Sequence, residues 1–519
     1  MSVGYNQFQL QKETGLHPEG TVMLVGAALD GPPQAPFYLK EGVAPHEVLG
    51  QSPLADAYVA AKDAGATSIL AYRINGKKSE AILKDSQDRE IIQFHSISAS
   101  SLYNTIQLIL YPTHLYVVGT TGKVRSYFFD RHPTARELAY AINRDAFYGL
   151  VEFEATVLDE YRTLSNLVSV AETLLFKGGD EEVQYINHRD PQSESPTHAE
   201  TVTALLKERL KVSLFGEDPE DIEERTPVGE LGVLPFGVMV LCDMFHDDDE
   251  EFTEMLGSFC ENKTRDTGYG TVGVIGTRPI YPEVIDPGEA DEDGDVVAET
   301  VDFDETVRVR ALELVSLSES LSDMEAYKYV QVVIGHTEYV ESTNSAVPIA
   351  YAYAATQAVK PYYTMMSNKQ IAGFGKLNYQ FGKEDIALLT RNGYTCIVPS
   401  IRRGFVPFYA TSFSKDTTST KAKPHNLRIS QHISSMLTEE LDRLIGNRQD
   451  TLSIKESMET ANELLAALIQ DGIIRDFTLS YQLTENNTLL SLEVSFTPFS
   501  EVKSISSVAT ISFPKGVME

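Results

Sequence analysis

Apolar positions near the C-terminal end of the chain change from a helical to an extended period. Between residues 454 and 469 they recur three and four positions apart, and Ser453 and Glu456 have the spacing of a reciprocal helix cap. After Gly472 the period becomes two in both halves of 474–497, on either side of a polar turn, which predicts a β-hairpin. The alternating apolar positions of this hairpin include Phe477, Leu479, Tyr481, Leu490, Leu492, Val494 and Phe496.

A third alternating run follows the hairpin, with Ile505, Ile511 and Phe513 on one side, and it ends at Pro514. A hairpin alone is marginally stable and leaves two unpaired edges. The third run can complete a three-stranded meander within its own chain, or it can pair as an arm with a sheet edge in another copy of the chain. The spacing slightly favours the meander and leaves the arm open.

Strand and helix patterns alternate through most of the chain. A short alternating stretch at the N-terminal end, with Phe8 and Leu10 on one side, is either a frayed end or a second pairing arm. Continuous apolar runs, which are typical of buried parallel strands, lie at 22–29, 68–72, 237–242, 272–275, 329–334 and 395–398. Helical patterns separate several of these runs, at 54–63, 311–321 and 345–356, and another begins with the acidic residues 247–251. This alternation predicts an α/β fold.

Residues 80–155 have a different character, because β-rich runs follow one another and precede a helical pattern at 135–143. The runs lie at 105–111, 114–119 and 124–130. They predict an antiparallel meander that is covered by a helix, in a small inserted domain. A further helical pattern at 158–175 leads into a polar stretch at 177–200, which we interpret as a surface loop.

These patterns together predict a multidomain protein of α/β and α+β type. The α/β middle domain carries an inserted antiparallel β domain, and a C-terminal α+β domain consists of two helices and the hairpin. The predicted ranges are an N-terminal arm at 1–18, the α/β domain at 19–85 and 155–398, the inserted β domain at 86–154, the C-terminal domain at 399–500 and a C-terminal arm at 501–519.

The composition is typical of a soluble globular protein. Hydrophobic residues make up 42% of the 519 residues and charged residues make up 23%. The three cysteines, Cys242, Cys260 and Cys396, are too few and too scattered for a disulfide framework, which suits a reducing cytoplasm. Because the first residues lack a signal-peptide pattern and no apolar run has membrane-spanning length, we expect synthesis in the cytoplasm without membrane insertion.

The formal net charge of −32 argues against a nucleic-acid-binding protein, because phosphate contacts need clustered Lys and Arg. From residue 401 onward the chain carries 12 Lys and Arg against 14 Asp and Glu, which leaves 31 against 61 in the first 400 residues. This asymmetry fits acidic domains that face solvent and a last domain that packs against partners. A solvated acidic surface explains it almost as well.

Candidate chemical motifs are incomplete. The G-x-G-x-x-G at 268–273 leads into a strand instead of opening a helix, and 375–383 lacks the spacing of a phosphate-binding loop. His246, followed by the acidic residues 247–249, could bind a metal, but a solvated helix start is the favoured interpretation. The aspartates in 291–295 lack the glycine position of a calcium loop. We therefore predict no catalytic, cofactor or metal site, although groups distant in sequence could converge.

Several further segments occur in a recognisable order. They are 22–26 with the Gly-Pro pair 31–32, 48–50, 54–58 and 65–73, then 99–106, 127–130 and 138–143, then 259–261, 368–373 and 392–393, and finally the terminal helices and hairpin. In this order they resemble the contractile tail sheath proteins of bacteriophages and of related contractile injection systems. The resemblance covers nearly the whole chain.

The resemblance implies a structural, non-enzymatic protomer that assembles as stacked sixfold rings around an inner tube and contracts to drive the tube through a bacterial envelope. Implied partners are other copies of the chain in hexameric rings, the tail tube protein, and the baseplate and tail terminator proteins. The implied location is the virion tail, assembled in the host cytoplasm. The inserted domain would protrude, the 399–500 domain would face the tube, and terminal arms would exchange strands between subunits.

Strand exchange would bring Phe8, Leu10, Ile505, Ile511 and Phe513 to the hairpin strands of neighbouring copies. Candidates for tube contact are Arg402, Arg403, Arg428 and Arg443, although exposed helix charges explain them too. Two other functions stay open. One is a cytoplasmic α/β enzyme whose acidic loops bind a divalent metal, and the other is a different virion structural oligomer, such as a baseplate or capsid component.

Overall fold

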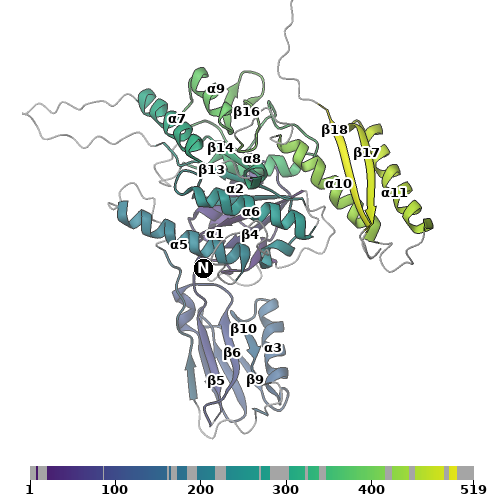
Figure 1. Cartoon of the computed structure of the whole chain (residues 1–519). Helices are drawn as coiled ribbons and strands as arrows, with labels where there is room; N and C mark the ends of the chain where they lie inside the picture. Colours follow the sequence, from purple (N-terminus) through teal and green to yellow (C-terminus); the bar gives the residue numbers. More distant parts are fainter. Residues whose placement is uncertain are drawn as a thin grey trace, which may run out of the picture. The chain divides into compact units, whose positions relative to one another are not determined.

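The computed structural model divides the chain into two compact units, Met1–Ser435 and Met436–Glu519. Figure 1 shows the helices and strands of both units. The structure describes residues 8–9, 20–85, 87–159, 163–164, 172–183, 196–216, 229–267, 270–280, 303–321, 325–337, 346–414, 423–442, 451–483 and 490–499.

A nine-stranded sheet forms the centre of the first unit. In spatial order its strands are β1 (Phe8–Gln9), β3 (Pro36–Leu39), β4 (Ser68–Arg73), β2 (Thr21–Gly26), β12 (Val238–Phe245), β13 (Val272–Gly276), β14 (Val330–Ile334), β15 (Tyr394–Ser400) and β16 (Gly404–Pro407). The strands from β4 to β15 run parallel, and the outer strands pair antiparallel. Every residue of β2, β4, β13 and β14 is buried, which explains their continuous apolar sequences and confirms the predicted strands.

Helices cover both faces of this sheet and produce two hydrophobic cores. One core lies under α5 (Pro196–Phe215), α6 (Glu250–Thr267), α7 (Phe303–Ser320) and α9 (Lys383–Arg391). The other lies under α1 (Pro45–Leu49), α2 (Pro53–Asp63) and α8 (Ile349–Val359). Short 3₁₀ turns occur at η3 (Ser101–Thr105), η5 (Glu230–Val233) and η6 (Glu325–Tyr329). The first unit is therefore a layered α/β body, as the strand and helix alternation predicts.

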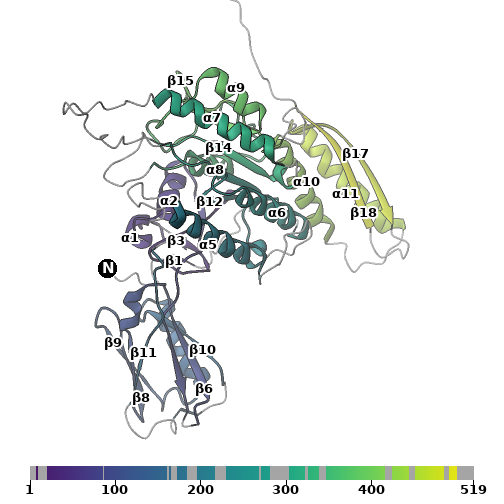
Figure 2. The same ribbon diagram turned by 60° about the vertical axis from the view of Figure 1, so that its left-hand side comes forward.

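Two antiparallel sheets and one helix form the insert, which has a hydrophobic core of its own. The three-stranded sheet has the order β10 (Phe153–Val157), β6 (Glu90–Ser96), β5 (Glu80–Lys84). The four-stranded sheet has the order β11 (Glu172–Leu175), β7 (Gln107–Leu110), β8 (His114–Val118), β9 (Val124–Phe128). Helix α3 (Ala135–Phe147) begins with a reciprocal cap between Thr134 and Glu137. Figure 2 shows β8, β9 and β11 on one side of the insert and β6 and β10 on the other. The meander expected from the sequence is confirmed.

The structure corrects three sequence interpretations. The helical pattern at 158–175 is wrong at its end, because β11 pairs with β7 and a short apolar run does not distinguish strand from helix. Helix α5 begins at Pro196, inside the stretch interpreted as a loop. Strands β5 and β11 lie outside the range expected for the insert, and β16 belongs to the nine-stranded sheet instead of the C-terminal domain.

The second unit contains the predicted helix and hairpin. Helix α10 (Pro424–Asp442) crosses the boundary between the units, and α11 (Thr451–Gln470) begins two residues before the expected cap. Strands β17 (Ile474–Leu483) and β18 (Leu490–Pro498) pair antiparallel, with Phe477 opposite Phe496. Gly472 ends α11 in the left-handed conformation, with φ of 70°. The hairpin is therefore confirmed, whereas the run 505–513 lies outside the described residues.

Candidate functional site: pairing edges and a buried polar junction

The β17–β18 hairpin has two strands only among the described residues of its sheet, so both outer edges present unpaired backbone groups there. Phe477, Leu479, Val494 and Phe496 are half-buried and alternate with exposed polar residues. The register joins Leu479 to Val494, and Tyr481 to Leu492. Such an edge can accept a further strand through main-chain hydrogen bonds.

The N-terminal strand β1 lies on a different sheet. Phe8 pairs with Leu39, and Gln9 pairs with Tyr38, at the edge of the nine-stranded sheet of the same chain. Leu10 lies outside the described residues, as do Ile505, Ile511 and Phe513. The structure therefore brings Phe8 to β3 and does not bring it to the hairpin.

The arginines proposed for tube contact have different environments. Arg402 and Arg403 are exposed in the turn between β15 and β16, beside the fully exposed Ile401. Arg428 is buried, and its guanidinium donates to the carbonyl oxygen of Gln357 at 3.0 Å, near the C-terminal end of α8. The suggestion of tube contact is therefore wrong for Arg428, because its donors serve the interior of the first unit. Arg443 lies outside the described residues.

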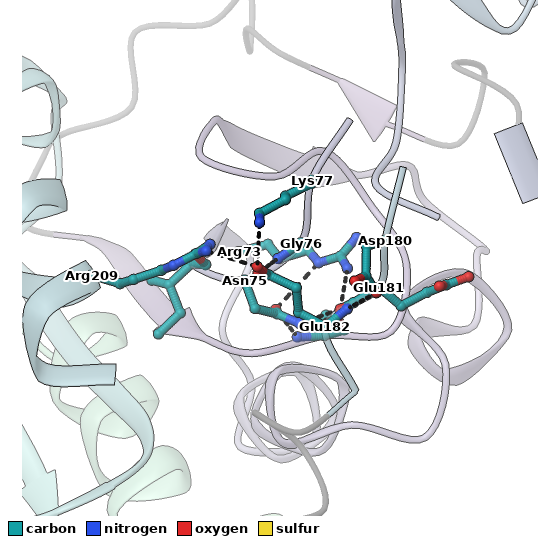
Figure 3. Close-up of polar contacts among 10 residues, drawn as sticks. Arg73, Asn75, Gly76, Lys77, Asp180, Glu181, Glu182 and Arg209 are labelled. Atoms are coloured by element: carbon teal, nitrogen blue, oxygen red, sulfur yellow. Dashed lines mark hydrogen bonds and ion pairs between the residues drawn. The ribbon is translucent and has the colours of Figure 1, made fainter. Parts of the chain in front are cut away.

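A buried arginine lies where the chain leaves the nine-stranded sheet for the insert. Arg73 is the last residue of β4 and is fully buried. Its Nη1 donates to the carbonyl oxygens of Gly31 at 2.9 Å and Ala99 at 3.1 Å. Its Nη2 donates to the carbonyl oxygen of Glu181 at 3.2 Å (Figure 3). One guanidinium therefore ties together three segments that are far apart in sequence.

Asn75 extends this polar junction, together with the two chain segments around Lys77 and Asp180 that enter and leave the insert and that we call its stem. The Nδ2 of Asn75 donates to the carbonyl oxygens of Ala28 at 3.0 Å and Glu181 at 2.9 Å. Lys77 and Asp180 exchange two backbone hydrogen bonds, of 2.8 and 3.1 Å. The entering and the returning chain are thus paired directly at the base of the insert (Figure 3).

Glu182 supplies buried negative charge to the junction. Its carboxylate accepts from the backbone N–H of Gly76 at 2.6 Å and from Nη2 of Arg209, on α5, at 2.8 Å. Burial lowers the pKa of Arg73 to about 10, which leaves the guanidinium charged at neutral pH. Burial also raises the pKa of Asp30, which lies close to this cation. A buried charge cluster of this kind is stable only while each partner remains.

The sequence interpretation missed the junction because its acidic members lie in the stretch taken for a surface loop. The available signal was an arginine that directly follows a continuous apolar strand, with a glycine three positions later. Gly76 has φ of 95°, and a Cβ there would lie 2.5 Å from the Arg73 guanidinium. The glycine is therefore needed both for its backbone conformation and for the space that it leaves.

His246 lies in the core and not at a solvated helix start, so that favoured interpretation is wrong. Its Nδ1 is 2.8 Å from the hydroxyl of Thr253, and its Nε2 is 3.2 Å from the hydroxyl of Tyr394. The neighbouring Asp247 pairs with Arg278 and Arg310. Within the described part of the chain, no three His, Cys, Asp or Glu side chains are grouped to hold a metal ion.

We expect the free energy of unfolding to decrease as the pH falls from about 6.5 toward 3, because the buried His246 must be protonated on acidification. Burial lowers the pKa of His246 to about 3, so the unfolded chain binds this proton first. The stabilisation is complete above the unfolded pKa and is lost toward the folded one, by up to about 1.4 kcal/mol per pH unit. Urea unfolding of the wild type and His246→Gln at pH 7, 6 and 5 measures the effect. The free energy of unfolding should fall less in the variant than in the wild type over this range. Equal losses in the two proteins would show that protonation of His246 does not cause the pH dependence.

The point where strand order reverses in the nine-stranded sheet lies between β2 and β12, and such points bind ligands in many doubly wound folds. Here Gly26 approaches Cys242 so closely that a Cβ on residue 26 would lie 2.6 Å from that of Cys242. The hydroxyl of Tyr351 accepts from the backbone N–H of Asp243 at 2.9 Å. These residues therefore pack closely at this point of the sheet.

Comparisons with known proteins identify the fold. No protein-family model and no curated protein matches the sequence. The sheath tail protein of Listeria innocua is similar over 94% of this chain and 93% of its own, with 14% identity and a TM-score of 0.50. The sheath tail protein of Desulfitobacterium hafniense is similar over 95% and 99%, with 12% identity and a TM-score of 0.45. The contracted helical sheath of the anti-feeding prophage is similar over 60% and 82%, with 14% identity and a TM-score of 0.37.

Among the described helices, none combines the length and the apolar composition that crossing a bilayer requires. The α/β body with its inserted β sheets and the helix-and-hairpin unit agree with the fold that the sequence resemblance implies. The similarity at a TM-score of 0.50 extends over nearly the full length of both chains. This protein therefore has the fold of the sheath tail protein from Listeria innocua.

Proposed function

We propose that this chain is the structural protomer of a contractile tail sheath, which assembles as stacked sixfold rings around an inner tube and contracts to drive that tube through a bacterial envelope. The observation that carries the proposal is the fold shared with a sheath tail protein over 94% of the chain. The protomer works through binding and rearrangement, without a catalytic step or a cofactor. Its partners are other copies, the tube, the baseplate and the tail terminator, and its location is the virion tail.

Strand pairing between copies holds this assembly together. The hairpin edges of β17 and β18 accept the C-terminal run with Ile505, Ile511 and Phe513 from a neighbouring copy. The open edges among the described residues of this sheet support this role. Main-chain hydrogen bonds of an added strand survive rotation of the domains when the flanking segments flex, so the network persists while outer surfaces exchange contacts.

The tube lies against basic residues of the protomer. The turn between β15 and β16 is the best-placed candidate, because Ile401, Arg402 and Arg403 are all exposed there. An exposed aliphatic side chain beside two guanidinium groups suits an acidic surface with an apolar recess. Arg443 remains a second candidate for this contact.

Electron microscopy of the purified full-length chain tests the proposed function. At high protein concentration, alone or with a tube protein, we expect rings or helical cylinders. Sedimentation over a concentration series supplies the quantitative measurement, since mass action makes assembly depend on concentration. A chain that stays strictly monomeric under all these conditions would overturn the proposal.

A further inference from the structure

The four-stranded sheet of the insert buries one face and exposes the other. Leu108, Leu110, Leu115 and Val117 point into the insert core, and each is at most 2% exposed. The residues between them on β7 and β8 point outward, because side chains alternate along a strand. The structure describes all four strands, and none of their outward positions carries a charged Asp, Glu, Lys or Arg side chain.

We call this surface the outer sheet face and define it by Ile109, Tyr116, Val118, Val124, Ser126 and Phe128. Val124 is 54% exposed and Phe128 is 44% exposed. A solvated sheet face usually carries polar side chains in alternation with the buried ones, so exposed aliphatic and aromatic groups mark a contact surface.

Rings at one end of the outer sheet face stack on one another. The centroids of Tyr111 and His114 are 4.7 Å apart, and those of His114 and Phe128 are 5.2 Å apart. Aromatic rings such as these pack favourably against side chains of a protein.

Helix α3 exposes a second apolar surface on the same insert. Tyr140, Phe147 and Tyr148, which we call the α3 stripe, are 73%, 67% and 59% exposed. The opposite side of α3 packs into the insert core through Leu138 and Ile142. Helix α3 packs against β10 and β6, and its Asp145 meets the inward-facing Tyr127 of β9, so α3 lies on the core side of the four-stranded sheet and not on the outer sheet face. One insert therefore presents two apolar surfaces in different directions.

Charge indicates which molecule covers these surfaces. Residues 77–177 carry 11 Lys and Arg against 12 Asp and Glu, which leaves 32 against 63 in the rest of the chain. The segment from residue 401 onward is also nearly neutral, so the excess acid lies in the remaining residues, with 20 Lys and Arg against 49 Asp and Glu. Two copies that approach through these acidic parts repel each other, whereas two inserts approach with almost no net charge. The insert is thus one of two parts of the chain where copies meet at low electrostatic cost, and it is the part that carries both exposed apolar surfaces.

We propose that the outer sheet face of one copy docks against the α3 stripe of a second copy. The contact is head-to-tail, because two different surfaces of the same insert are used, and such contacts propagate into rings or helices. It rests on the assembly of copies proposed above, and it adds a contact through the insert to the strand pairing of the terminal segments.

Single cysteines test this contact in the full-length chain. Cys242, Cys260 and Cys396 are buried, so a short bismaleimide reports on introduced thiols. A mixture of Ser126→Cys and Tyr140→Cys chains should give covalent dimers, and neither variant alone should do so. Dimers from Ser126→Cys alone would show that the sheet face meets itself and would overturn the proposed pairing.

The outcomes separate this inference from the proposed function. Polymers without cross-links in the mixture would overturn the insert contact and leave the sheath proposal standing. Cross-linked dimers without any polymer would overturn the sheath proposal and leave the insert contact standing. A charge on the face, Val124→Asp, should lower the cross-link yield about tenfold or more, because docking would bury an unpaired carboxylate. The control Gln87→Asp adds the same charge at an exposed position between β5 and β6, which belongs to neither of the two surfaces, and should leave the yield unchanged.

Discussion

Removal of residues 502–519 is expected to abolish assembly while both units stay folded. In the proposed sheath these residues supply the strand that pairs with the open edge of β17 or β18 in a neighbouring copy. About four main-chain hydrogen bonds, at roughly 1 kcal/mol each, correspond to a loss on the order of a thousandfold in association. Sedimentation and electron microscopy measure assembly, and circular dichroism measures the helical content that includes α10 and α11.

A matched deletion controls for the loss of terminal residues as such. Removal of 515–519 keeps the alternating run that ends at Phe513 and should leave assembly intact. If removal of 502–519 instead unfolds the second unit, the last run belongs to the sheet of its own chain, which is the meander that spacing alone favours. Normal assembly after this deletion would remove the C-terminal arm from the mechanism.

Replacement of Arg73 by methionine is expected to lower the free energy of unfolding by about 3–5 kcal/mol, the range for breaking a buried charge cluster. The change leaves the carbonyl oxygens of Gly31, Ala99 and Glu181 without their guanidinium donor. The stem of the insert should then open more often, so limited proteolysis should cut near 77–80 in the variant before it cuts the wild type. Urea unfolding and a proteolysis time course measure the two effects.

The same substitution at an exposed position isolates the effect of burial. Arg89 is 58% exposed and pairs at 2.8 Å with the buried Asp85. Because the Asp85 carboxylate keeps hydrogen bonds from the backbone N–H groups of Gln87 and Arg89, Arg89→Met should cost about 1 kcal/mol. Arg73→Lys keeps the charge and loses the planar fork, so it should fall between the two methionine variants. Equal stabilities of Arg73→Met and Arg89→Met would show that the junction does not hold the insert.

Local sequence patterns predict the elements whose burial is the same along their length. The parallel strands β2, β13 and β14 are buried on both faces, and a continuous apolar run is the direct consequence. The β17–β18 hairpin is visible because its half-buried and exposed residues alternate. In these cases a residue's environment follows from its position within one element.

The patterns fail where the partner of an element decides its structure. The sequence ETLL at 172–175 is compatible with strand or helix, and pairing with β7 selects the strand. The polar stretch that includes Glu181 and Glu182 reads as a loop, yet the junction buries Glu182 against Arg209. The environment of His246 also depends on a distant segment, because the hydroxyl of Tyr394 is one of its hydrogen-bond partners.

From the sequence alone, the α/β class, the meander, the hairpin and the absence of a complete ligand motif could be determined, because they depend on periodicity and spacing within single segments. The tertiary structure decided the placement of β1 on the nine-stranded sheet, the burial of Arg428, the Arg73 junction and the two exposed surfaces of the insert. Each of these depends on which segments meet across long sequence distances. Burial and hydrogen bonding act between such segments, and the pattern of residues within one segment does not show which other segment it contacts.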